Sequence, residues 1–439
     1  MLVQDGPPGG DCTFVGCVPS KTLIEATARG ADFEDAMVQV RATVARIAAT
    51  ESAEVLRREG IEVIDGRAKI VAADRVSVGG RELRTRRLVV GTGPGPLIPP
   101  IPGLDGLDVL DVLTNENVFD LDRRPASLAI IGGGPIGVEL AQAFARLGTA
   151  VSIVEGASRL LPREEPEASA AVTAALTADG VSVTVGRQVS AAAAAADVAG
   201  VCLRLDDGTT RKAARLLVAV GRRPGATDSG FGPPGVVTED RGYVVTDRHL
   251  RTKVPGVYAA GDVTGRSQFT HVADEMGRIA ATNALSLIAY RTFRDERIPA
   301  VTYTDPEVAR VGLSESEAAA AYPGARVAYL PLTEVDRAVT ADRTGGYIKL
   351  IAGPRRATKN LAGGRLLGAT IVAARAGEMI AIPTLAIATG MFSARLALTV
   401  QAYPTWTLGV RQAAAQLFIE SGGRRARPAQ PSHATPDDT

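Results

Sequence analysis

The residues best suited to chemistry are Cys12 and Cys17, which lie in the segment GGDCTFVGCVPSK at positions 9–21. A cysteine reacts as its thiolate, and the unpaired backbone N–H groups of a helix N-terminus lower the pKa of a thiol placed there. Pro19 suits the first turn of a helix, so a helix is predicted to begin at Cys17. Lys21, one turn further on, adds positive charge near the sulfur. We interpret the two cysteines as a redox pair; a structural disulfide or two buried thiols are the alternatives.

A second segment, residues 128–156, has the order apolar strand, glycine turn, helix and strand. Gly132, Gly134 and Gly137 fit G-x-G-x-x-G: the first glycine allows a tight turn, the second lets a pyrophosphate approach, and the third lets helix pack on strand. Glu155 closes the second strand, where its carboxylate can accept hydrogen bonds from both ribose hydroxyls and would repel a 2′-phosphate. The segment therefore predicts a dinucleotide site that prefers NADH. NADPH stays open, because an arginine follows four residues later.

These segments, together with RTKVPGVYAAGDVTG at residues 251–265, resemble the flavin-dependent pyridine nucleotide-disulfide oxidoreductases, the family of dihydrolipoyl dehydrogenase, glutathione reductase and mercuric reductase. The resemblance covers nearly the whole chain. It implies an α/β fold with two Rossmann-like nucleotide-binding domains, for FAD and NAD(P), and a C-terminal α+β dimerisation domain. The strand-and-glycine segments from Leu88 and from Leu216 are similar to each other, which indicates an internal duplication.

The predicted domain limits follow this resemblance. They are 1–122 for the first part of the FAD domain, 123–240 for the NAD(P) domain, 241–297 for the second part of the FAD domain, 298–422 for the dimerisation domain, and 423–439 for a polar, proline-rich tail that should be disordered.

Composition fits a cytoplasmic enzyme. The chain has 439 residues, 46% of them hydrophobic, and its 49 basic and 48 acidic residues give a net charge of +1. That balance gives no reason to expect a nucleic-acid partner, and the length fits about two to four domains. With three cysteines and no signal peptide or long apolar run, neither a secreted disulfide scaffold nor a membrane protein is expected. The most apolar stretch, residues 379–392, is broken by Pro383 and is interpreted as a buried helix pair.

The resemblance implies that hydride passes from NAD(P)H to flavin N5, then to the Cys12–Cys17 disulfide, and on to a small-molecule acceptor. Cys17 would be the thiol that faces the flavin, and Cys12 the interchange thiol. Lys21 and Glu139 would form a salt bridge beside N5 that stabilises negative charge on the reduced ring. Two solvated helix charges are the alternative for that pair. The dimerisation domain implies a homodimer.

The resemblance also implies cofactor contacts. Asp262 would bond the ribityl chain of FAD, and residues 268–271 would line the isoalloxazine. Pro135 stands where some relatives place a tyrosine that gates the nicotinamide pocket. The other residues predicted at the cofactors are Gly10, Lys21, Thr92, Gly93, Gly261, Gln268, Phe269, Thr270, His271, Gly132, Gly134, Ile136, Gly137, Glu155, Val189 and Gly221.

The chain departs from the family at its start. Relatives carry a strand, a G-x-G-x-x-G turn and a helix before the redox cysteines, whereas eleven residues precede Cys12. Residues 1–4 look like the second strand of that unit, with Gln4 or Asp5 where a ribose-binding acid is expected. Without the central strand, the domain lacks the helix N-terminus that holds the FAD diphosphate. We favour a true start upstream over a damaged copy of the gene.

A second departure lies near the C-terminus. Relatives that act on dithiol substrates show a base and its orienting carboxylate in a His-Pro-Thr segment, but this chain has Tyr403 in place of the histidine and Leu408 in place of the glutamate. Gln401 replaces a further histidine. Tyr403 is retained as a candidate catalytic residue, although a tyrosine with a pKa of about 10 cannot act as a base at neutral pH. The other histidines, His249, His271 and His433, offer no obvious replacement.

These departures leave the acceptor open among a disulfide, a quinone, dioxygen, a dye and a thiol-reactive metal. The extra C-terminal cysteine pair of mercuric reductases is absent, and Cys202 is interpreted as a buried strand residue. A resident zinc site at Cys12 and Cys17 lacks further ligands, so no bound metal is expected. The competing interpretation is a truncated, FAD-free pseudoenzyme that dimerises through residues 298–422.

Overall fold

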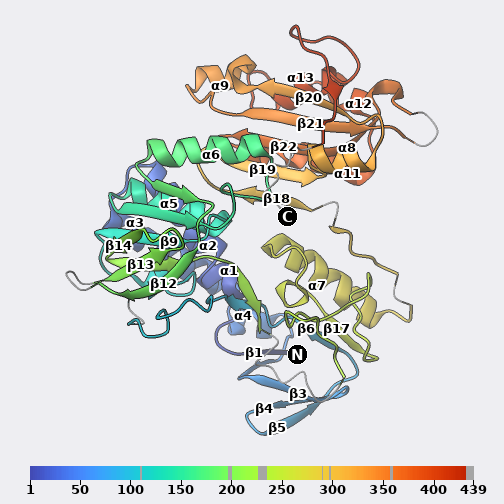
Figure 1. Ribbon diagram of the computed structural model, residues 1–439. Coiled ribbons are helices and arrows are strands. Elements are labelled where there is room, and N and C mark those ends of the chain that lie inside the picture. Colours follow the sequence, from blue (N-terminus) through green and yellow to red (C-terminus); the bar gives the residue numbers. More distant parts are fainter. Residues whose placement is uncertain are drawn as a thin grey trace. The chain divides into compact units, whose positions relative to one another are not determined.

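The computed structural model describes residues 1–108, 111–195, 200–225, 235–288, 290–295, 298–355 and 359–431. The chain forms two compact units, residues 1–154 with 187–295 and residues 155–186 with 296–439 (Figure 1). Residues 155–186, which the sequence analysis assigned to the NAD(P) domain, fall in the second unit, and the functional domain limits stay a prediction.

The first unit contains the predicted strand–turn–helix–strand segment. Strand β9 (Ser127–Ile131) leads through the glycine turn into helix α5 (Pro135–Arg146) and then into β10 (Ala150–Glu155). The strands β10, β9, β15 (Arg215–Val218) and β8 (Val112–Leu113) lie in that order and pair in parallel. Most of their side chains are apolar, and those of β9 and β15 are largely buried, as expected for a sheet covered on both faces.

An antiparallel sheet of β12 (Val189–Ala194), β13 (Val201–Leu205) and β14 (Thr210–Ala213) belongs to the same unit. Cys202 lies on β13 as predicted, although it is half-buried rather than buried.

Four helices follow the first residues of the chain: α1 (Gly10–Phe14), α2 (Cys17–Ala28), α3 (Phe33–Thr50) and α4 (Ala53–Arg58). The predicted start of a helix at Cys17 is confirmed. Helix α2 packs against α3 and α5, with Leu23 and Ala26 fully buried. Asp32 caps α3 by accepting a hydrogen bond from the Asp35 N–H. This packing fixes α2, and with it Cys17, against the dinucleotide-binding segment.

The rest of the described part of the first unit consists of short strands, short 3-10 helices and one long helix. Strand β1 (Leu2–Gln4) pairs in parallel with β2 (Val63–Asp65), and β6 (Leu88–Val90) pairs in parallel with β17 (Val257–Ala259). Strands β3 (Ala68–Ala72), β4 (Arg75–Val78) and β5 (Arg81–Arg84) form an antiparallel sheet. The remaining elements are η1 (Val118–Asp120), η3 (Asp262–Thr264) and α7 (Thr270–Leu285).

The two segments that are similar in sequence meet in the structure. Strand β7 (Pro94–Pro96), which follows β6, pairs antiparallel with β16 (Arg222–Pro224), which follows β15. The glycine-containing ends of both segments therefore lie side by side.

The second unit is built on a sheet with the order β18-β19-β22-β21-β20-β23. These strands span Pro299–Thr302, Glu307–Gly312, Arg365–Ala373, Tyr347–Gly353, Arg326–Pro331 and Arg427–Pro428. The other elements of this unit are α6 (Pro166–Ala178), β11 (Ser182–Val185), α8 (Glu315–Ala321), η5 (Leu332–Glu334), α9 (Asp336–Thr340), η6 (Leu361–Gly363), α10 (Ala376–Met379), α11 (Ala381–Thr389), α12 (Ser393–Leu398) and α13 (Leu408–Ala415).

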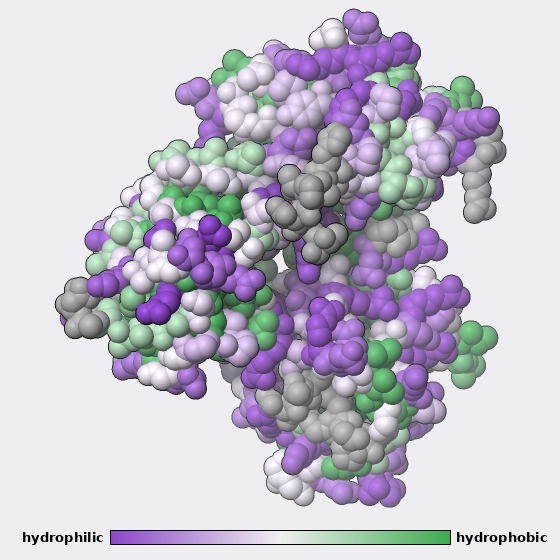
Figure 2. Space-filling view, viewed as in Figure 1, coloured by the Kyte–Doolittle hydropathy of each residue, from purple (hydrophilic) through white to green (hydrophobic). Residues whose placement is uncertain are grey.

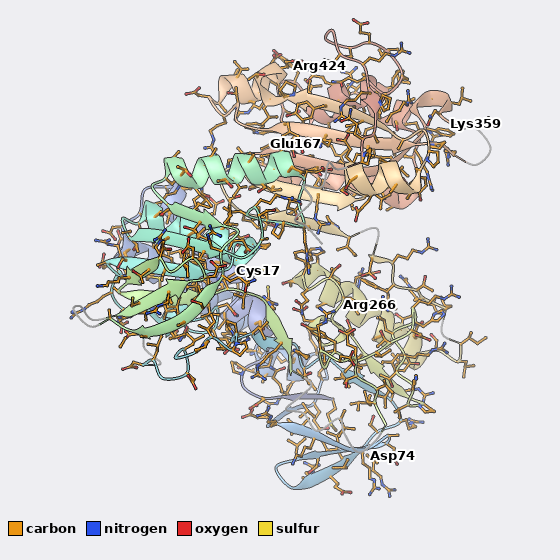
Figure 3. All side chains as sticks on the ribbon, viewed as in Figure 1. Cys17, Asp74, Glu167, Arg266, Lys359 and Arg424 are labelled. Carbon is orange, nitrogen blue, oxygen red and sulfur yellow. The ribbon has the colours of Figure 1, made fainter. Side chains whose placement is uncertain are left out.

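Buried charge explains why residues 155–186 belong to the second unit. The Lys349 ammonium, 1% exposed on β21, lies 3.3 Å from Glu165 and 2.7 Å from Glu167. Arg310 on β19 pairs with Glu164 at 2.8 Å. A buried charge requires a partner, so these carboxylates tie the segment to the sheet. Glu167 is labelled on α6 in Figure 3.

The tail begins as ordered structure. Strand β23 pairs with β20, and Arg424 forms an ion pair with Glu334 at 2.6 Å. The prediction that residues 424–428 are disordered is therefore wrong. The reason is that backbone pairing and two arginine–carboxylate contacts hold this segment. Residues 432–439, including His433, lie outside the described residues.

The apolar stretch of residues 379–392 was predicted to be a buried helix pair, but most of it is one helix, α11, which follows the end of α10 at Met379, and Leu385 on α11 is 59% exposed. The break falls at Ile380, and Pro383 occupies the first turn of α11, where proline is tolerated. Among the described residues, no helix has the length and apolar character needed to cross a membrane. Hydrophilic side chains cover most of the face shown in Figure 2.

Candidate active site around Cys12 and Cys17

A tight glycine turn holds the two cysteines together. Cys12 lies on α1, and Cys17 is the first residue of α2. A Cβ atom at Gly16 would lie 2.7 Å from the Asp11 carbonyl oxygen and 3.0 Å from the Cys12 Cα atom. The close approach therefore needs glycine at position 16. Both cysteines are thiols in this structure, with Cys12 half-buried and Cys17 exposed.

The pKa values of the two thiols are shifted in opposite directions. A hydrogen bond from Cys12 lowers the pKa of Cys17 to about 5, and the Lys21 charge and the Thr270 hydroxyl act in the same direction against partial burial. The same hydrogen bond, together with burial, raises the pKa of Cys12. At neutral pH the pair therefore consists of a Cys17 thiolate and a Cys12 thiol. A thiolate is the nucleophilic and metal-binding form of cysteine.

Lys21 and Glu139 meet as predicted. The Lys21 ammonium lies 2.8 Å from the Glu139 carboxylate, which joins α2 to α5. The Glu139 side chain is 6% exposed and that of Lys21 is 30% exposed, so the two are not solvated helix charges. A role for this pair beside flavin N5 stays a prediction.

The N-terminus of α7 faces Cys17. The Thr270 hydroxyl lies 3.5 Å from the Cys17 sulfur, and Thr270 is the first residue of this 16-residue helix. Phe269 stacks on His271, with 5.5 Å between the ring centroids, and His271 is exposed. Gln268 donates a hydrogen bond to the Tyr243 hydroxyl. The predicted flavin-lining residues thus lead into α7, which begins at Thr270 and whose positive end favours an anion.

Removing the Thr270 hydroxyl should raise the pKa of Cys17. In the wild-type protein, the rate of Cys17 alkylation by iodoacetamide should rise through half its maximum near pH 5, because only the thiolate reacts. In Thr270→Val this midpoint should move to higher pH, since a donor to the thiolate is lost. Thr282→Val, further along α7, is the matched control. Equal midpoints in the two variants would contradict the assigned role.

Asp262 has an arginine partner that the sequence analysis did not identify. Arg222 on β16 lies 2.7 Å from the Asp262 carboxylate, whose side chain is 10% exposed. Burial raises the pKa of Asp262, and Arg222 opposes that shift. Burial likewise raises the pKa of Asp11, which feels the charges of both groups. The only signal for Arg222 was its place in the GRRP segment that follows an apolar strand.

The glycines of the dinucleotide segment have the backbone geometry that the spacing predicts. A Cβ atom at Gly132, which has a φ of 110°, would collide with the Ala219 carbonyl oxygen, and one at Gly137 would collide with the Gly132 carbonyl oxygen. A Cβ atom at Gly134 would meet nothing within 4 Å. Gly134 therefore leaves open space at the N-terminus of α5, and Pro135 and Ile136 begin that helix. This open N-terminus fits a pyrophosphate.

Glycines predicted at the FAD site also border open space. Cβ atoms at Gly10 and Gly93 would meet nothing within 4 Å, and both residues have a positive φ. Gly261, with a φ of 79°, precedes the buried Asp262. Thr92 and Gly93 approach Gly225 closely through their carbonyl oxygens, and Gly221 has a φ of 138°. These open backbone positions, with the α7 N-terminus beside Cys17, fit a flavin cofactor.

The remaining predicted residues are less informative. Glu155 ends β10 and accepts a hydrogen bond from the Ala157 N–H at 2.7 Å. Val189 begins β12 and packs against a hydrophobic cluster. His249 contacts the Arg291 carbonyl oxygen at 2.8 Å, which is a structural role.

Tyr403 lies in the second unit and is 69% exposed. A hydrogen bond to Asp336 raises its pKa, which makes it a still poorer base. Gln401 has a buried side-chain oxygen without a hydrogen-bond partner among the described residues, and Leu408 begins α13. No base for dithiol exchange therefore replaces the missing histidine at these positions.

Comparison with known proteins shows the family of this chain. Residues 1–277 match the family described as pyridine nucleotide-disulphide oxidoreductase, and residues 298–414 match the dimerisation domain of that family. Mercuric reductase from Bacillus cereus is 33% identical over 94% of this chain, and the chain spans 66% of that relative's length. Mercuric reductase from Streptomyces lividans is 34% identical over 94% of the chain and 90% of the relative.

Other similar proteins differ in name. Dihydrolipoyl dehydrogenase from Thermus scotoductus is 31% identical over 96% of this chain and 92% of the relative. A solved structure of similar fold is the Cu(II) complex of the HOCl-induced flavoprotein disulfide reductase RclA from Escherichia coli. It has a TM-score of 0.86 and 27% identity, and the match covers 94% of this chain and 92% of that one.

Proposed function

Because the chain belongs to the pyridine nucleotide-disulphide oxidoreductase family, we propose that it reduces a thiophilic metal ion at Cys12 and Cys17 at the expense of NAD(P)H. The coarse function is that of an FAD-dependent NAD(P)H oxidoreductase, and the pseudoenzyme interpretation is not favoured. FAD, when bound, accepts hydride from NAD(P)H and delivers electrons to sulfur. The acceptor and the roles of individual residues are the proposed part.

The chain's own residues divide the work. The α5 N-terminus with Gly134 would hold the dinucleotide, and Asp262 with the open glycines would hold FAD. Thr270 and Lys21 help to keep Cys17 ionised, so this sulfur can act as a nucleophile or bind a metal ion as a thiolate. Cys12 retains its proton until an acceptor arrives, and it then provides the second sulfur.

We choose a metal ion as acceptor because the Cys17 thiolate lies next to the Cys12 thiol. Two soft sulfur ligands select soft metal ions. Reduction of such a metal ion needs no acid–base catalyst. Disulfide exchange does need one, and Tyr403 with its raised pKa is a poor candidate. Two of the relatives described above are named mercuric reductases, which supports the same acceptor class. For Hg²⁺ the balance is one NADH and one Hg²⁺ giving NAD⁺, H⁺ and Hg⁰.

The proposal also includes the electron donor, the oligomeric state, the domain limits and the cellular compartment. NADH is the preferred donor, since Glu155 would repel a 2′-phosphate. The protein is a homodimer, supported by the dimerisation-domain match and by exposed apolar residues there, Leu385, Leu398 and Val400. The functional domains keep the limits given above, 1–122 with 241–297 for FAD, 123–240 for NAD(P) and 298–422 for dimerisation. The protein works in the cytoplasm, where thiols stay reduced.

An acceptor panel tests the proposal. NADH oxidation by the flavin-loaded enzyme is followed without oxygen in the presence of thiol-buffered Hg²⁺, Cu²⁺, lipoamide or benzoquinone. We expect a metal ion to give the highest kcat/KM, at least about tenfold above lipoamide. A higher value with lipoamide would overturn the metal assignment, and a higher value with benzoquinone would show that the two sulfurs are not the site of acceptor reduction.

A further inference from the structure

We propose that a pocket in the second unit binds a phosphate monoester. The pocket has a volume of about 600 Å³ and is lined by Tyr322, Pro354, Arg355, Arg365 and Gly390. Tyr322 follows the end of α8, Pro354 and Arg355 follow β21, Arg365 begins β22, and Gly390 follows the end of α11. Lys359, which pairs with Arg355, is labelled in Figure 3. None of the lining residues belongs to the cysteine site or to the predicted cofactor contacts.

Both arginines are held by aromatic rings rather than by acids. The Arg365 guanidinium carbon lies 5.5 Å from the Tyr322 ring centroid, and the Arg355 carbon lies 4.0 Å from that of Phe392. Such stacking occupies the face of a guanidinium and leaves its N–H edge available. Within the described residues, neither arginine has a carboxylate partner.

Arg365 also carries an unmet donor. Its Nε atom is buried and has no hydrogen-bond partner among the described residues, and its Nη2 atom reaches only the Tyr322 hydroxyl at 3.4 Å. Because the Nε atom is closed off from solvent, an oxyanion in the pocket would accept hydrogen bonds from the other N–H groups of the Arg365 guanidinium. A Cβ atom at Gly390 would meet nothing within 4 Å, which keeps this side of the pocket open.

Charge and size select the ligand class. Two guanidinium groups carry two positive charges, and a phosphate monoester carries about −1.5 to −2 at pH 7 with three acceptor oxygens. A carboxylate would balance only one arginine. The volume exceeds what inorganic phosphate needs and lies within the range of small-molecule pockets, about 300 to 1,000 Å³. The ligand is therefore an organic molecule with one terminal phosphate, whose body lies against Pro354 and Tyr322.

Calorimetric titration of the flavin-loaded enzyme tests this site. NAD⁺ is kept at saturation, so that the dinucleotide site cannot contribute, and the probes are ribose 5-phosphate, ribose and succinate. We expect one ribose 5-phosphate per chain, and at least tenfold weaker binding in both Arg355→Gln and Arg365→Gln. Arg337→Gln is the matched control, because Arg337 stacks over Trp406 in the same unit but does not line the pocket.

Each result has one meaning. No saturable binding to the wild-type protein, or equal affinity in the Arg355→Gln and Arg337→Gln variants, would overturn the site. Succinate binding as tightly as ribose 5-phosphate would overturn the phosphate assignment. If Arg365→Gln fails to fold, Arg355→Gln still decides the matter. Since the titration measures no electron transfer, its outcome is independent of the proposed acceptor.

Discussion

Cys12→Ser should abolish acceptor reduction, with a loss of at least about 10³-fold in kcat, the scale on which enzymes lose activity with their nucleophile. The serine hydroxyl can still donate a hydrogen bond to Cys17, which is the largest cause of the low pKa of that thiol. Cys17 should therefore stay ionised, while the second sulfur needed for a disulfide or a two-sulfur metal complex is missing. Reduction of bound flavin by NADH, followed by stopped-flow absorbance, should remain fast.

Cys202→Ser is the control, because Cys202 lies on β13 away from the pair and should leave turnover unchanged. Cys17→Ser should differ from Cys12→Ser in one respect. The pH-dependent alkylation with a midpoint near pH 5 should disappear in Cys17→Ser and persist in Cys12→Ser. Full turnover in Cys12→Ser would show that electrons leave the enzyme without passing through the cysteine pair.

Lys21→Met should both destabilise the protein and raise the pKa of the Cys17 thiol. The variant leaves the Glu139 carboxylate, 6% exposed, without the ammonium that lies 2.8 Å away. Removing one partner of a fully buried ion pair costs about 3 to 5 kcal/mol, and because Lys21 is 30% exposed we expect a smaller loss, about 2 kcal/mol. The pKa of Cys17 should rise, because Lys21 lowers it and Glu139 raises it.

Glu139→Gln provides a matched test of opposite sign. It removes the buried charge and leaves Lys21 able to reach water, so urea unfolding should show a smaller loss than Lys21→Met. The alkylation midpoint of Cys17 should fall in Glu139→Gln and rise in Lys21→Met, since the two charges act on the thiol in opposite directions. Shifts in the same direction would mean that the variants act through a change in the position of α2.

Patterns within about thirty residues were enough to predict much of the candidate site. The helix start at Cys17, the strand–turn–helix–strand order around Gly132 and the tight packing at Gly137 depend on local backbone geometry, which residue type and spacing specify directly. The Lys21–Glu139 contact was predicted from family resemblance, and the structure shows an ion pair between the buried Glu139 and the partly exposed Lys21. The roles of these residues in turnover remain predictions.

What the sequence by itself determined about this protein is the identity of its reactive sulfurs and the local elements that carry them. Only the tertiary structure decided what surrounds those elements: Thr270 beside Cys17, 253 residues away in sequence, and Arg222 beside Asp262. It also decided that residues 155–186 join the second unit, because Lys349 is buried among Glu165 and Glu167. No local pattern specifies these contacts, since a charge or hydroxyl acquires its partner only when distant strands and helices pack together.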